Sequence, residues 1–87
     1  MENTLERILE FMPDETFLKM DGHDDAVIGY CTETNRLIYS VKKVIDGLIA
    51  QGMDEDEAVE FYEYNIVRSI PYMGESAPIL CDDYYFQ

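Results

Sequence analysis

MDEDEAVEFYEYNIVRSIPYMGESAP, residues 53–78, is the stretch that decides the predicted fold. A helix is expected to begin at Asp54, because Glu57 three residues later completes a capping box. The run of acidic residues that opens the helix also lies where the helix dipole stabilises negative charge. Pro71 is expected to end the helix, and a turn then leads into a short apolar strand at 77–81.

The apolar residues of this helix cover a broader arc than a helix with one packed side requires. Phe61, Tyr62 and Ile66 are predicted to pack against the sheet, together with Ala58. The width of the arc indicates a second packed side. That side is expected to contact either the N-terminal helix or a second subunit.

Local patterns predict the remaining elements. Apolar residues at helical spacing indicate a helix at 4–12 and another at 41–51. Two β-rich runs within 26–41 flank the turn-tolerant Asn35 and predict a hairpin, in which Gly29 marks a bulge or a close helix contact. The expected helix caps are Asn3, Ser40 and Asp54.

These elements predict an α+β fold. A small antiparallel sheet, made of the hairpin at 26–41 and the strand at 77–81, is covered by two or three helices. The chain of 87 residues is expected to form one domain over 1–87, with an acidic aromatic tail at 82–87.

Charge limits the partners that the chain is expected to bind. Six basic and nineteen acidic residues give a formal charge of −13, which repels nucleic acid phosphates and anionic membranes. A hydrophobic fraction of 47% and an aromatic fraction of 13% nevertheless predict a folded chain. Direct binding to nucleic acid or to a membrane is therefore not expected.

The compartment is inferred from cysteines and hydropathy. No apolar run approaches the ~18 residues of a membrane span, and no signal peptide pattern precedes the first predicted helix. Cys31 and Cys81 lie in apolar stretches and are expected to be buried thiols. The prediction is a cytoplasmic protein.

Catalytic and metal-binding patterns are weak. Asp21, His23, Asp24 and Asp25 offer ligands for a divalent ion, but the EF-hand spacing is absent and turns are ordinarily rich in Asp and Gly. No Cys-His signature or Gly-rich phosphate loop is present. We therefore expect no enzymatic activity and no cofactor, and a metal-dependent enzyme is the least favoured alternative.

Tyrosines among carboxylates are more informative, because tyrosine is enriched in binding interfaces. Tyr62 is expected to complete the core, whereas Tyr64 lies on the outer side of the helix with Glu60 and Glu63. The residues predicted to bind a partner are Asp54, Glu55, Asp56, Glu60, Glu63, Tyr64, Tyr72 and Glu75.

Over residues 17–82 the chain resembles a group of small uncharacterised proteins from phages and prophages. The most specific shared pieces are Asp21-Gly22, Asp24-Asp25-Ala26, Ile28-Gly29, Glu57-Ala58, Glu63-Tyr64-Asn65 and Gly74-Glu75. His23 departs from the aromatic residue usual at its place in the group, which weakens the metal interpretation further. The resemblance implies a viral setting in a host cell and assigns no catalytic residue.

Two hypotheses follow. The first is a non-enzymatic acidic phage-type accessory protein that inhibits or redirects a host protein with a basic surface. A nucleic-acid-binding defence or transcription component is the expected kind of target, bound by charge mimicry. The second is a homodimeric interaction module formed through the broad apolar arc of the central helix.

Overall fold

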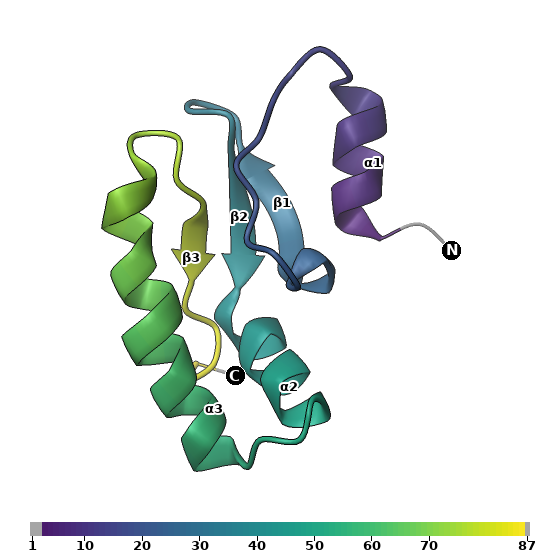
Figure 1. Cartoon of the computed structure of the whole chain (residues 1–87). Coiled ribbons are helices and arrows are strands. Elements are labelled where there is room, and N and C mark those ends of the chain that lie inside the picture. Colours follow the sequence, from purple (N-terminus) through teal and green to yellow (C-terminus); the bar gives the residue numbers. More distant parts are fainter. Residues whose placement is uncertain (1–2, 87) are drawn as a thin grey trace.

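The computed structural model describes residues 3–86 and forms a three-stranded sheet with helices around it (Figure 1). This arrangement confirms the predicted α+β class. In chain order the elements are α1 (Thr4–Phe11), η1 (Asp24–Ala26), β1 (Val27–Cys31), β2 (Arg36–Ser40), α2 (Val41–Ala50), α3 (Glu55–Phe61), η2 (Tyr62–Ile66), η3 (Val67–Met73) and β3 (Ile79–Cys81). Positions 1, 2 and 87, which the predicted domain and tail include, lie outside the described residues.

The strand order is β1-β2-β3, and the sheet is mixed. β1 and β2 pair antiparallel as the predicted hairpin, whereas β3 pairs parallel to β2 and not antiparallel as expected. The reason is the long connection through α2 and α3, which returns the chain to the end of the sheet where β2 began. Pro78 directly precedes β3, which is an edge strand and therefore tolerates the missing N–H.

The hairpin has the bulge and the turn that its local sequence predicts. The register shifts between Val27 and Gly29, so a bulge lies in β1. A Cβ at Gly29 would meet no atom within 4 Å, so the glycine marks the bulge and not a close helix contact. Asn35 has a φ of 54°, a conformation that asparagine tolerates better than most residues.

Each α-helix begins directly after the residue that the sequence predicts as its cap. Asn3, Ser40 and Asp54 accept hydrogen bonds from the backbone N–H three residues on, at 2.8, 3.2 and 2.8 Å. At Asp54 the reciprocal bond is also present, because its N–H donates to the carboxylate of Glu57 at 3.4 Å. The predicted capping box is confirmed.

The helical segment after Asp54 changes its winding twice. α3 is an α-helix, η2 is a π-helix and η3 is a 3₁₀ helix that ends before Gly74, which has a φ of 84°. The prediction that the helix ends at Pro71 is wrong, because Pro71 lies inside η3. A proline ring clashes with the carbonyl four residues earlier in an α-helix, and the winding around Pro71 is no longer α-helical.

The core lies where β1 and β2 meet α1, α2 and the connector at 12–20. Tyr39 is fully buried, and its Oη accepts a hydrogen bond from the N–H of Met20 at 2.9 Å. The largest fully buried side chains are Tyr39, Leu37, Ile45, Val27, Val41, Val44 and Ser40. Most of this core therefore comes from β2 and α2.

α3 contributes less to the core than predicted. On α3, Ala58 is buried but Phe61 is 38% exposed, so the prediction that Phe61 packs against the sheet is wrong. On η2, Ile66 is buried and Tyr62 is half-buried. The helix that packs against α3 is α2, which was not among the expected contacts; α1 packs against β1 and η1 instead (Figure 1).

The exposure of the two cysteines differs from the prediction. Cys81 is exposed and Cys31 only half-buried, so neither is the buried thiol that was predicted; both are free. In the part of the chain that the structure describes, no helix is long and apolar enough to cross a membrane.

Candidate interaction surface

Two hollows lie on the outer side of α3 and η2, and both are lined by Glu60 and Tyr64, which we call the Glu60–Tyr64 ridge. The apolar hollow has a volume of about 450 Å³ and is lined by Met53, Glu57, Glu60, Phe61, Tyr64 and Asn65. The acidic hollow has a volume of about 570 Å³ and is lined by Glu55, Asp56, Val59, Glu60, Glu63, Tyr64, Tyr84 and Tyr85. Glu60 and Tyr64 are one helical turn apart, so they form a shared wall.

The inward residues of the segment explain why this side faces outward. Ala58 and Ile66 are buried, so the helix presents its Glu60 side to solvent. The π-helical turn η2 then places Tyr64 and Asn65 beside the hollows. Tyr64 is 54% exposed, and the guanidinium of Arg68 lies 4.7 Å from the centre of its ring.

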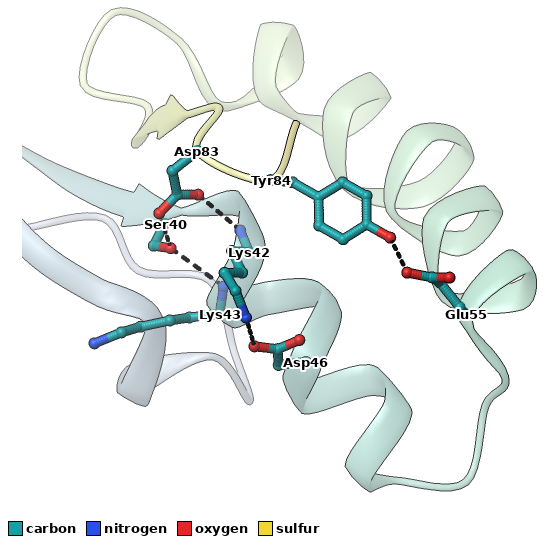
Figure 2. A network of polar contacts seen from close by, with 7 residues as sticks. All are labelled: Ser40, Lys42, Lys43, Asp46, Glu55, Asp83 and Tyr84. Atoms are coloured by element: carbon teal, nitrogen blue, oxygen red, sulfur yellow. Dashed lines mark hydrogen bonds and ion pairs between the residues drawn. The ribbon is translucent and has the colours of Figure 1, made fainter. Parts of the chain in front are cut away.

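The C-terminal tail contributes Tyr84 and Tyr85 to the lining of the acidic hollow. Asp83 fixes the position of the tail, as Figure 2 shows. The Asp83 carboxylate accepts hydrogen bonds from the Ser40 hydroxyl at 2.5 Å and from the Lys42 N–H at 2.8 Å, at the start of α2. Partial burial alone would raise the pKa of Asp83, but these two hydrogen bonds hold it below its ordinary value. The tail is thereby attached to α2.

Tyr84 attaches the tail to α3. Its hydroxyl donates a hydrogen bond to the Glu55 carboxylate, as Figure 2 shows, and this bond raises the pKa of Tyr84 to about 12. Tyr85 packs edge-on against it, with ring centres 4.8 Å apart. Burial, and then the nearby Asp82 and Glu63 carboxylates, raise the pKa of Tyr62 to about 12.

Negative charge at the acidic hollow is not neutralised within the chain. Positions 44–87 contain ten acidic residues and one basic residue, Arg68. Within residues 3–86, the side chains of Asp56, Glu60 and Glu63 form no ion pair within 4.0 Å; Lys42 and Asp46 on α2 pair at 2.7 Å. Such a surface attracts cations and offers tyrosine rings on which they stack.

The predicted partner-binding residues separate into two groups. Glu55, Asp56, Glu60, Glu63 and Tyr64 line the acidic hollow together. The other three, Asp54, Tyr72 and Glu75, do not line it: Asp54 caps α3, Tyr72 is 91% exposed on η3, and Glu75 is exposed in the turn before β3.

Sequence reasoning missed several lining residues. Phe61 and Asn65 were recoverable, because their spacing of four residues places them on one side of a helix. Tyr84 and Tyr85 belong to the predicted aromatic tail. Their position beside α3 depends on the hydrogen bond from Tyr84 to Glu55, which lies 29 positions earlier in the chain. No local pattern predicts such a contact.

The candidate metal ligands are not assembled into a site. Among the described residues, no group of three or more His, Cys, Asp or Glu side chains is placed to hold a metal ion, and Asp21, His23, Asp24 and Asp25 are included in that finding. Asp24 and Asp25 begin the 3₁₀ turn η1. Burial lowers the pKa of His23, although the neighbouring Asp24 opposes this shift.

Comparison of the chain with protein-family models, with curated proteins and with solved structures found no match. The interpretation of the surface therefore depends on its own geometry and charge.

Proposed function

We propose that the protein is a non-enzymatic binding protein that uses the outer side of α3 to contact a basic surface on another protein. The observation that carries the proposal is the acidic hollow, where three α3 carboxylates, the η2 carboxylate of Glu63 and three tyrosines gather around one depression. Tyrosine supplies large contact area at low conformational cost, and unpaired carboxylates complement lysine and arginine.

The net charge of −13 supports the same proposal at longer range. Complementary charge speeds the encounter of two proteins and disfavours partners of the same sign. Glu55 and Glu63 are eight residues apart, so the carboxylates extend over roughly 12 Å of helix. A row of this kind presents negative charge to a groove that otherwise binds phosphates.

We therefore propose a nucleic-acid-binding protein as the partner, inhibited or redirected by charge mimicry. The resemblance to phage and prophage proteins leads us to propose the cytoplasm of a host cell as the setting. Nucleic acid itself is not the proposed ligand, because like charges repel at close range.

The test compares two variants of equal charge in affinity capture from host lysate. Glu60→Gln/Glu63→Gln and Asp14→Asn/Glu33→Gln each change the net charge from −13 to −11, but only the first alters the acidic hollow. Asp14 and Glu33 are exposed and lie outside α3. The variants therefore separate local recognition from overall charge.

A partner with a basic surface should be retained by the wild type and by Asp14→Asn/Glu33→Gln, and lost with Glu60→Gln/Glu63→Gln. Its retention should weaken as salt rises, and added double-stranded DNA should compete for it. Equal capture by both variants, or capture that neither salt nor DNA reduces, would contradict the proposal.

A further inference from the structure

The two hollows share the Glu60–Tyr64 ridge but differ in chemistry, and this difference specifies what the partner presents. We propose that the partner binds through one segment that carries an apolar side chain next to an arginine. The apolar side chain occupies the apolar hollow, and the guanidinium occupies the acidic hollow. This inference rests on the proposed function and adds the composition of the partner's segment.

The apolar hollow has the surface that an aliphatic or aromatic side chain requires. Phe61 remains 38% exposed and Met53 is partly exposed, so apolar area is available for burial against a partner. Methionine adapts its shape to the side chain that contacts it. The Asn65 amide at the rim offers a donor and an acceptor to the backbone of a bound segment.

The acidic hollow favours arginine over lysine. A guanidinium is planar, stacks on aromatic rings and pairs with carboxylates in a fork geometry, whereas an ammonium is more strongly hydrated. The chain itself places a guanidinium on one of the lining rings, since Arg68 lies 4.7 Å from the centre of the Tyr64 ring. Tyr84 and Tyr85 supply two further rings to its lining.

The acidic hollow is also formed before binding. Asp83 attaches the tail to α2, and the hydroxyl of Tyr84 attaches it to Glu55 on α3. Tyr85 is 63% exposed but packs edge-on against Tyr84. A wall that is already ordered loses little conformational entropy when the arginine enters.

The experiment is an NMR titration of the full chain with three capped synthetic peptides of equal length in a Gly-Ser background. The first contains adjacent Leu and Arg, the second replaces Leu with Ser, and the third replaces Arg with Gln. The Leu-Arg peptide should bind about tenfold more tightly than either other peptide, a difference of about 1.4 kcal/mol. It should shift the backbone amides of Val59, Glu60, Tyr64 and Asn65, together with those of Tyr84 and Tyr85.

Two variants that each remove one negative charge provide the control. Glu60→Gln should weaken the Leu-Arg peptide several-fold, and Glu33→Gln in the hairpin turn should leave its affinity unchanged. The inference is overturned if the Ser-Arg peptide binds as tightly as the Leu-Arg peptide, or if it shifts amides over all acidic surfaces. The proposed function, binding of a basic surface, would still stand in that case. If neither arginine peptide affects α3 at low salt, the inference and the proposed function both fail.

Sedimentation of the free protein completes the test. The inference predicts that both hollows are open in the unbound chain. A dimer in which the Leu-Arg peptide shifts no amide of the residues that line the hollows would assign the hollows to a second copy and would overturn the inference.

Discussion

β2 with α2 and the segment that starts with α3 differ in how their residues are used. In β2 and α2, Leu37, Tyr39, Ser40 and most apolar positions of the helix are almost completely buried. In the segment from α3 to η3, only Ala58 and Ile66 are buried, and large apolar side chains such as Tyr64 remain exposed. The difference indicates that the side chains of β2 and α2 are needed for folding, whereas many side chains of the segment from α3 to η3 are not.

Polar groups show the same contrast. Among the described residues, no buried side-chain nitrogen or oxygen is left without a hydrogen bond. Tyr39 and Ser40 in the core bond to Met20 and Asp83, respectively. By contrast, Glu60 on α3 and Glu63 on η2 are exposed and point away from the core. Substitutions in the two regions are therefore expected to have different consequences.

The largest effect on stability is expected from Ile45→Ala in α2. Ile45 is 1% exposed, and removing a buried aliphatic side chain lowers the free energy of unfolding by about 2–5 kcal/mol. Ile49→Ala on the same helix is the matched control, because Ile49 is 38% exposed and should change stability by less than about 1 kcal/mol. Urea denaturation measures both, and equal effects would contradict the burial contrast.

Tyr39→Phe should have the next largest effect. The substitution leaves the buried Met20 N–H without its acceptor, which lowers the free energy of unfolding by about 1–3 kcal/mol. Tyr72→Phe removes the same hydroxyl from a residue that is 91% exposed, and no measurable change is expected. A Tyr39→Phe variant as stable as the wild type would show that the Met20 N–H finds another partner.

Asp83→Ala tests the attachment of the tail and should lower the free energy of unfolding by about 1 kcal/mol at neutral pH. The folded pKa of Asp83 lies below its unfolded value, so its contribution is present above about pH 4. That contribution is lost as the pH falls through the folded pKa. The difference from the wild type should thus shrink in acid, and a difference that does not change with pH would contradict the attachment.

A smaller effect is expected from Glu55→Gln, which changes the environment of Tyr84. The hydrogen bond to Glu55 raises the pKa of Tyr84 to about 12, so folding favours the protonated phenol. This contribution is present below about pH 10 and is lost as the pH rises toward the folded value. NMR of the Tyr84 ring should show its pKa fall toward the ordinary value in Glu55→Gln, and an unchanged pKa would contradict the contact.

The sequence was sufficient wherever a few neighbouring residues decide the structure. Asn3, Ser40 and Asp54 cap their helices because a side chain and an N–H three residues away satisfy each other locally. The bulge near Gly29 and the positive φ of Asn35 are local in the same sense.

The sequence was insufficient where distant segments meet. The direction of β3 depends on where the crossover through α2 and α3 delivers the chain, and not on the residues of the strand. Helical spacing places Phe61 in the apolar arc of the predicted helix. However, the packing of α2 against α3 leaves Phe61 exposed. The sequence predicted only the helical side of the acidic hollow, because helical spacing brings those residues together. The side formed by the tail depends on the contact between Tyr84 and Glu55.

The claim that the outer side of α3 serves a partner, and not the fold, is tested most directly by the free energy of unfolding of Glu60→Gln. Glu60 is one helical turn from Asp56 and Glu57 on one side and from Glu63 on the other. Each like-charge pair at this spacing destabilises a helix by about 0.2–0.5 kcal/mol. Glu60→Gln should therefore raise the free energy of unfolding slightly at low salt, and the gain should disappear at high salt. A clear loss of stability would show that Glu60 supports the fold and would contradict the account.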